Sequence, residues 1–171
     1  TPSGPTTVDS VTLSTAAAGG EKDTVSVSAG MFVSCCGAWA GSLARMIGID
    51  DIPVFPRKRC VFGFDSAEPV PDLPLMVDPT GVYVRPEGKG FLCGKSPAEG
   101  CDPDFPDDES SCELLQVTEA DYEWFEEELW PALAHRVPRF EAIKPTHSWS
   151  GFYEFNTFDA NGLIGRHADV S

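Results

Sequence analysis

Three histidines are the first candidates for chemistry in this sequence, because an imidazole can carry a proton or bind a metal near neutral pH. His135, His147 and His167 are not separated by the short intervals that a zinc site uses. The sequence also has no G-x-S-x-G elbow, no G-x-x-x-x-G-K-[ST] loop and no G-x-G-x-x-G fingerprint. A glycosidase-like carboxylate pair stays open, although the acidic residues lie in a loop-like run. The residue types therefore predict no metal and no self-contained active site.

The cysteines are the second candidates, and the sequence has six of them. None are spaced as C-x-x-C, so we expect neither a zinc ribbon nor a thioredoxin-like motif. Cys101 and Cys112 flank an acidic stretch, and whether they pair stays open, although a reducing compartment is favoured. The other four lie in apolar runs and are predicted to be small core residues: Cys35, Cys36, Cys60 and Cys93.

The chain has a large negative net charge that is concentrated in one segment. The formal net charge is −15, which argues against nucleic acid as a partner because phosphate binding needs clustered Lys and Arg. Thirteen Asp and Glu and no Lys or Arg lie between Glu99 and Glu128, so the rest of the chain is close to −2. We interpret this run as a solvated loop and helix face; the alternative is a docking surface for a basic partner. No apolar run approaches the roughly 20 residues that span a bilayer, so no transmembrane segment is expected.

The first fifty residues predict strands followed by one helix. Alternation at 8–13 indicates a ragged strand, a turn follows at Gly19-Gly20, and alternation from Thr24 onward indicates an exposed strand. Residues 31–36 are almost continuously apolar and predict a strand that is buried on both faces. Gly37 interrupts this run, and the apolar spacing at 39–47 predicts a helix that ends at Gly48. A strand, a Gly turn and a helix make the βα unit of a nucleotide-binding sheet.

An antiparallel meander is predicted next. Short strands at 61–64, 75–77, 82–84 and 91–93 are separated by turn signals, among them DPTG at 78–81. After the acidic run, Thr118 is a plausible N-cap for a helix whose apolar stripe is Tyr122, Phe125, Leu129 and Leu133. Pro131 should restart this helix near Trp130, and Pro138 should end it. Extended segments are predicted at 149–155 and 163–164.

Several of these segments, in this order along the chain, resemble the D-amino-acid oxidase family of FAD-dependent oxidoreductases. Residues 32–40, FVSCCGAWA, are similar to the family's apolar strand with its Gly-Ala-Trp turn and helix. Residues 53–64, with PRKR at 56–59, are similar to its crossing from flavin domain to substrate domain. Residues 74–88, followed by GKSP at 94–97, resemble its substrate-sheet hairpin, and residues 149–165 resemble its strand that returns toward the flavin ring.

The resemblance implies an α/β plus α+β fold, in which a partial FAD-binding, Rossmann-like domain joins a substrate domain with an antiparallel sheet. We expect residues 1–52 to be the last βα unit of the FAD domain and 53–148 to be the substrate domain. Residues 149–171 would be strands returning toward the FAD domain. The family's Gly-rich first strand and Gly-rich final segment have no counterpart here, so we expect the main FAD-binding segments to be missing and this chain alone to bind FAD weakly.

The implied chemistry is the transfer of a hydride from the carbon next to an amine, in a small amine or amino acid, to FAD. The resemblance places Tyr153 facing the substrate and Lys95 and Ser96 on the substrate sheet above the flavin ring, as candidate catalytic residues. Some relatives tether FAD through a Cys near the position of Gly151, which Gly cannot do, so noncovalent FAD is expected. The candidate cofactor-binding residues are Cys35, Cys36, Gly37 and Gly151.

Plainer interpretations stay open for three of these features. Trp39 can also be a core aromatic that packs a helix on the sheet, and Tyr153 can be a buried aromatic of a strand. Residues 57–59 can be a solvated basic turn. NTFDANG at 156–162, with LWP at 129–131 and RVP at 136–138, is most similar to a mitochondrial subgroup linked to assembly of respiratory complex I. The hypotheses are therefore a catalytic FAD enzyme, a mitochondrial assembly factor on the same fold with complex I intermediates as partners, or a free-standing α+β binding domain.

Overall fold

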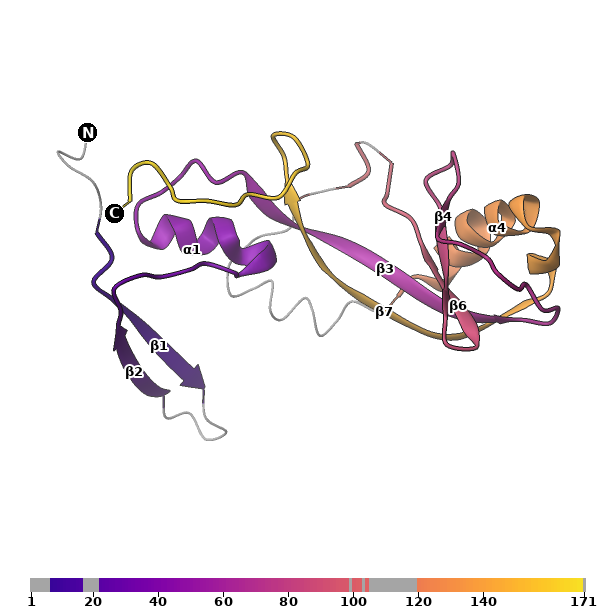
Figure 1. Cartoon of the computed structure of the whole chain (residues 1–171), viewed down its shortest axis with the longest axis horizontal. Helices are drawn as coiled ribbons and strands as arrows, with labels where there is room; N and C mark the ends of the chain where they lie inside the picture. The colour runs from indigo at the N-terminus through magenta and orange to yellow at the C-terminus, as the bar shows by residue number, and fades with distance from the viewer. Residues whose placement is uncertain (1–6, 17–21, 99, 103, 105–119, 171) are drawn as a thin grey trace.

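The computed structural model describes residues 7–16, 22–98, 100–102, 104 and 120–170 (Figure 1). Two antiparallel sheets are present among these residues: a two-stranded hairpin and a five-stranded sheet of order β4-β5-β6-β3-β7. The hairpin joins β1 (Ser10–Ala16) to β2 (Lys22–Ser28), with Ser10 opposite Ser28. The two strands predicted from alternation are confirmed, and the predicted Gly19-Gly20 turn lies outside the described residues.

The predicted strand at 31–36 is wrong. These residues form no regular element, and Met31 and Val33 are 62% and 77% exposed. Cys35 and Cys36 are exposed too, which corrects their prediction as core residues. A strand needs a neighbour to pair its backbone N–H and C=O groups, and none of the strands that the structure describes lies alongside this segment.

The helix predicted after Gly37 is confirmed. Gly37, at φ +54°, opens the short 3-10 helix η1 (Gly37–Trp39), and α1 (Ala40–Met46) follows directly. Gly48 ends this element at φ +81°, a conformation that side chains with a Cβ rarely adopt.

The longest feature is the ribbon of β3 (Val54–Ser66) and β7 (Ile143–Asn156). The two strands pair from Val54–Asn156 to Ser66–Ile143, with one irregularity between Gly63 and Phe64. The ribbon runs from the α1 end of the molecule to the end that holds β4, β6 and α4 (Figure 1). The predicted strands at 61–64 and 149–155 are therefore parts of longer strands, and β7 runs through the predicted boundary at 148–149. Residues 163–164 form no strand, which corrects that prediction; Leu163 and Ile164 are 56% and 101% exposed.

The meander at the far end is confirmed as β4 (Met76–Val77), β5 (Tyr83–Glu87) and β6 (Gly90–Gly94). The predicted turn at 78–81 forms locally. Asp78 accepts hydrogen bonds from the Thr80 N–H at 2.9 Å and the Thr80 hydroxyl at 2.8 Å, while Gly81 takes φ +87°. Arg136 also donates to Asp78 at 2.7 Å, and this bond joins the turn to the helical segment.

The helical segment comprises α3 (Tyr122–Trp124), the π-helix η2 (Phe125–Leu129), α4 (Trp130–Arg136) and the 3-10 helix η3 (Pro138–Glu141). Asp121 is the N-cap, because its carboxylate accepts from the Trp124 N–H; the predicted cap Thr118 lies outside the described residues. The predicted restart at Trp130 is confirmed, with Pro131 in the first turn of α4 where its missing N–H is tolerated. The core packs this segment on the sheet: Phe62, Phe64, Phe91, Phe125, Leu129, Leu133 and Phe140.

Candidate functional site

The β3–β7 ribbon has two different faces. Side chains alternate along each strand, and directly opposite residues of an antiparallel pair project to the same face. On one side, which we call the packed face, Pro56, Cys60 and Phe62 are buried. On the other side, which we call the open face, Trp149 and Tyr153 remain 46% and 47% exposed. The open face consists of Phe55, Arg57, Arg59 and Val61 of β3 opposite Phe155, Tyr153, Gly151 and Trp149 of β7.

The centre of the open face is free of side chains at Gly151. A Cβ added to Gly151 would meet no described atom within 4 Å. Trp149 lies two residues before it and is stacked with His147 at 5.7 Å between centroids and 7° between planes; Tyr153 lies two residues after it. Two predicted site residues, Gly151 and Tyr153, are thus neighbours on one accessible surface. The plainer interpretation of Tyr153 as a buried aromatic is wrong, since its side chain is half-exposed.

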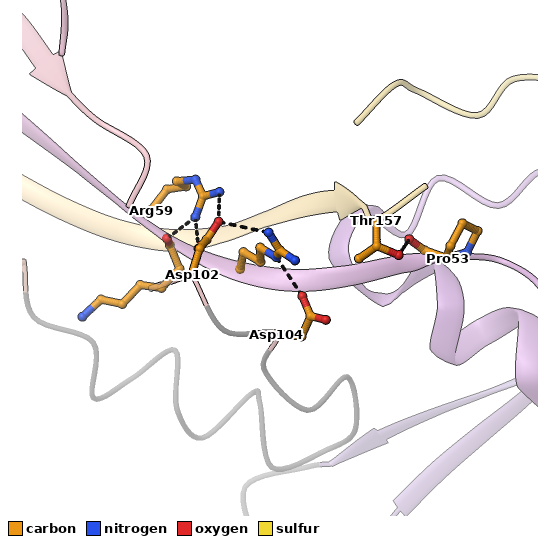
Figure 2. Close-up of polar contacts among 7 residues, drawn as sticks. Pro53, Arg59, Asp102, Asp104 and Thr157 are labelled. Atoms are coloured by element: carbon orange, nitrogen blue, oxygen red, sulfur yellow. Dashed lines mark hydrogen bonds and ion pairs between the residues drawn. The ribbon is translucent and has the colours of Figure 1, made fainter. Parts of the chain in front are cut away.

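Two arginines lie opposite these residues, Arg57 opposite Tyr153 and Arg59 opposite Gly151. The Arg57 guanidinium lies 3.8 Å from the centre of the Phe155 ring, and that of Arg59 lies 5.5 Å from the Tyr153 ring centre. Both arginines also contact Asp102, which approaches from a segment more than 40 residues later in the chain (Figure 2).

The contacts of Asp102 are specific. Its two oxygens accept from the two terminal nitrogens of Arg59 at 2.8 Å each, and one of them also accepts from Arg57 at 3.2 Å. Asp104 accepts from Arg57 Nε at 2.7 Å. Burial alone would raise the pKa of Asp102, but the hydrogen bonds and charges of Arg59 and Arg57 outweigh it and hold that pKa below its ordinary value. Burial likewise acts to lower the pKa of Arg57, and Asp104 and Asp102 raise it overall.

Sequence reasoning missed this cluster because it treated residues 57–59 as a solvated turn. The signal that was present is the two-residue spacing of Arg57 and Arg59, which puts both on one face once the segment is a strand. The partner Asp102 had no signal of its own within the acidic run.

Of the predicted cofactor-binding residues, Cys35 and Cys36 precede η1 and Gly37 is its first residue. Trp39 of η1 packs edge-on against Phe152, with ring centroids 6.1 Å apart. Phe152 lies between Gly151 and Tyr153 in sequence, on the packed face. The structure therefore brings η1, which begins at Gly37, to the same part of β7 as Gly151 and Tyr153, but along the packed face of the ribbon. The cofactor-binding roles of Cys35, Cys36 and Gly37 stay predictions.

Lys95 and Ser96 are not brought to this surface. They follow β6, whose Gly94 is opposite Val61 of β3. The Lys95 ammonium donates to Glu128 of η2 at 2.8 Å, so it lies on the side of the sheet that the helical segment covers. Ser96 is exposed. Their catalytic roles stay predictions.

Other candidate sites are weaker. Within the part of the chain that the structure describes, no three His, Cys, Asp or Glu side chains are arranged to hold a metal ion. His167 Nε2 contacts Asp51 at 3.0 Å and its Nδ1 accepts from the Asp169 N–H at 3.2 Å. Across the same residues, no helix has the length and apolar character that a membrane crossing requires.

Comparison with known sequences agrees with this architecture. The sequence pattern of the FAD dependent oxidoreductase family (DAO) matches residues 5–171. The chain belongs to this family, and the expected mixed α/β fold with antiparallel sheets is confirmed.

Individual relatives agree with the family. The chain is 38% identical over 159 residues to FAD-dependent oxidoreductase domain-containing protein 1 of Xenopus laevis, an alignment that covers 85% of this chain and 30% of that protein. It is 38% identical over 154 residues to the protein of the same name from Bos taurus, covering 82% and 30%. The chain thus spans about a third of the length of these relatives.

Solved structures show the same fold. Iminodiacetate oxidase from Chelativorans sp. BNC1 superposes with a TM-score of 0.58 at 13% identity, covering 94% of this chain and 42% of that one. L-proline dehydrogenase from P. horikoshii superposes with a TM-score of 0.53 at 22% identity, covering 86% and 37%.

Proposed function

We propose that this chain is the substrate-facing part of an enzyme that oxidises a small amine or amino acid by hydride transfer to FAD. The observation that carries the proposal is the open face, where half-exposed Tyr153 borders the free space over Gly151 and two arginines lie opposite. Family membership supports the cofactor, and the two structural neighbours are by name an oxidase of iminodiacetate and a dehydrogenase of L-proline.

The residues around Gly151 suit a planar ring system. The absence of a Cβ leaves a flat strip between Trp149 and Tyr153, and aromatic side chains at its two ends favour contact with another ring. These residues do not suit the phosphates of FAD, since the sequence has no Gly-rich phosphate loop. Gly151 has no nucleophile with which to form a tether, so we propose that FAD is held noncovalently, mainly by segments other than these.

The chemistry that FAD supplies when bound is acceptance of a hydride. The residues of this chain would bind and orient the substrate. Tyr153 offers a hydroxyl that can donate or accept one hydrogen bond at the edge of the strip. Trp149 and Tyr153 would exclude water from the reacting carbon, and the arginines favour a negative group on the substrate. Lys95 is engaged by Glu128, so the proposal depends on Tyr153 and not on Lys95 or Ser96.

The test uses the full-length protein loaded with FAD. It is mixed under anaerobic conditions with a panel of secondary amines and amino acids. We expect at least one of them to bleach the flavin absorbance. Tyr153→Phe should slow that bleaching by about tenfold through loss of substrate orientation. Tyr122→Phe is the matched control, because Tyr122 is equally exposed at 46% but its hydroxyl accepts from Ser148 on the packed face. Equal slowing by both substitutions, or no bleaching by any amine, would count against the proposal.

A second proposal is that FAD is structural and that the protein assists assembly of respiratory complex I in mitochondria. The observation that favours it is the exposed acidic helix surface at Glu123, Glu126 and Glu127, which would suit a basic partner. The mitochondrial location and this partner rest on the sequence resemblance. Loss of complex I on deletion, combined with flavin that no amine bleaches, would favour this second proposal over the first.

A further inference from the structure

Arg57 and Arg59 form a preorganised pair of cations on the open face. They are two residues apart on β3, so both project to the same side. The side chains of both are only 17% exposed, and each guanidinium lies against an aromatic ring of β7, at 3.8 Å for Phe155 and 5.5 Å for Tyr153. Rings that hold both guanidinium groups in place reduce the conformational freedom lost when an anion binds. Two neighbouring cations also repel each other, so this arrangement requires an anion between them.

The anion present is the carboxylate of Asp102. It meets Arg59 through two parallel hydrogen bonds of 2.8 Å and shares one oxygen with Arg57 at 3.2 Å. This two-bond geometry is the one by which arginine recognises any carboxylate, including that of an amino acid. Residues 100–102 and 104 are neither helix nor strand, and the Cys101 N–H donates to the Ala98 carbonyl at 2.9 Å in a turn just before Asp102.

We propose that Arg57 and Arg59 form a carboxylate-binding site, and that Asp102 is an internal carboxylate that occupies this site until a carboxylate-bearing ligand displaces it. The exchange conserves the bonds at the arginines, because the incoming carboxylate accepts the same hydrogen bonds that Asp102 gives up. Asp102 then gains water in their place. The proposal rests on the proposed oxidation of an amine, and it specifies an amine that also carries a carboxylate.

The position of the pair fits this role. Arg57 and Arg59 are directly opposite Tyr153 and Gly151, and the Cβ atoms of opposite residues in a sheet are about 5 Å apart. A ligand carboxylate between the arginines would therefore have its amine end close to the strip over Gly151. While Asp102 occupies the site, the apparent affinity for ligand equals the intrinsic affinity multiplied by the fraction of molecules in which the site is free.

The experiment measures how acetate protects Arg59 from phenylglyoxal in the FAD-loaded protein, with modification of the Arg59 peptide followed by mass spectrometry. Acetamide at the same concentration is the neutral control, and sodium chloride keeps the ionic strength constant. We expect acetate, and not acetamide, to slow the modification. In Asp102→Asn the half-protecting acetate concentration should fall by about tenfold or more, as expected when an occupant that is bound in about nine molecules of ten is removed.

Asp104→Asn is the matched control variant. Among the described residues, the Asp104 carboxylate pairs with Arg57 and not with Arg59, and its side chain is 40% exposed, so its loss should shift the half-protecting concentration by less than about threefold. Equal half-protecting concentrations in wild type and Asp102→Asn, or equal protection by acetamide, would overturn the proposal.

A second measurement covers the case in which Asp102→Asn does not fold. In wild-type protein, acetate should accelerate backbone hydrogen exchange in residues 100–102 as Asp102 is released, and an unchanged exchange rate would overturn the proposal. The outcomes also separate the two proposals. Bleaching by amines with no effect of acetate would refute only the proposed carboxylate site. Protection by acetate with no bleaching by any amine would refute only the proposed oxidation of an amine.

Discussion

Trp39 packs edge-on against Phe152, with ring centroids 6.1 Å apart and planes at 77°. The contact joins η1, which begins at Gly37, to the part of β7 that carries Gly151 and Tyr153. The indole Nε1 of Trp39 is buried and has no hydrogen-bond partner among the described residues. Trp39 therefore stabilises the protein through the packing of its ring and not through a hydrogen bond of its N–H group.

Substitution of Trp39 tests that statement. Trp39→Ala should lower the free energy of unfolding by about 2–4 kcal/mol, because it removes a large ring from a packed contact. Trp39→Phe should cost less than about 1.5 kcal/mol, since it retains a ring and deletes a buried donor that has no acceptor. Urea unfolding of the FAD-loaded protein measures both. A Phe variant as unstable as the Ala variant would show that the N–H group has a partner.

Two glycines should respond oppositely to the same substitution. A Cβ at Gly90 would lie 2.7 Å from the backbone oxygen of Phe64, so Gly90→Ala should destabilise the protein by about 1–3 kcal/mol. Gly151→Ala meets nothing within 4 Å and should change stability by less than about 0.5 kcal/mol. Yet Gly151→Ala should weaken FAD binding or slow flavin bleaching, because a methyl group would occupy the strip. Equal stability losses for the two variants would contradict the geometry.

Acid should destabilise the protein in a defined range of pH. Hydrogen bonds from the Thr80 N–H, Arg136 and the Thr80 hydroxyl lower the pKa of Asp78 to about 2. The folded-state pKa of Asp78 is below the unfolded value of about 3.9. The stability that the ionised Asp78 carboxylate contributes is therefore fully present above a pH of about 4, and it is lost as the pH falls from about 4 to about 2. Unfolding free energies across pH 2–5 should therefore fall less steeply for Asp78→Asn than for wild type. Equal slopes for Asp78→Asn and wild type would contradict this prediction.

The cysteines should differ in reactivity. Burial raises the pKa of the Cys93 thiol to about 12, and Cys60 is also buried, so both should resist iodoacetamide at pH 8 in the native protein. Cys35, Cys36 and Cys101 are exposed and should be alkylated under the same conditions. Peptide mass spectrometry before and after unfolding measures this. Labelling of native Cys93 at the rate of Cys101 would contradict the packing of β6.

Features that depend on a few neighbouring residues could be predicted from the sequence alone. The turn at 78–81 formed as expected because Asp78, Thr80 and Gly81 satisfy one another within four residues. Gly37 and Gly48 marked the ends of one helical element because only glycine adopts their backbone angles at little cost. Of the predicted apolar stripe, Phe125, Leu129 and Leu133 are buried, whereas Tyr122 is 46% exposed. The order of the segments along the chain identified the family.

Contacts between distant parts of the chain were decided only by the tertiary structure. Residues 31–36 have the composition of a buried strand, yet a strand forms only where another offers its hydrogen bonds, and composition does not say whether it does. Lys95 is held by Glu128, and Arg59 by Asp102, across separations of 33 and 43 residues. The sequence by itself determined the turns and the helical elements, because backbone angles and side-chain period are local. Which face of β3 meets which acidic residue depended on the pairing of β3 with β7, because that pairing sets where each side chain projects.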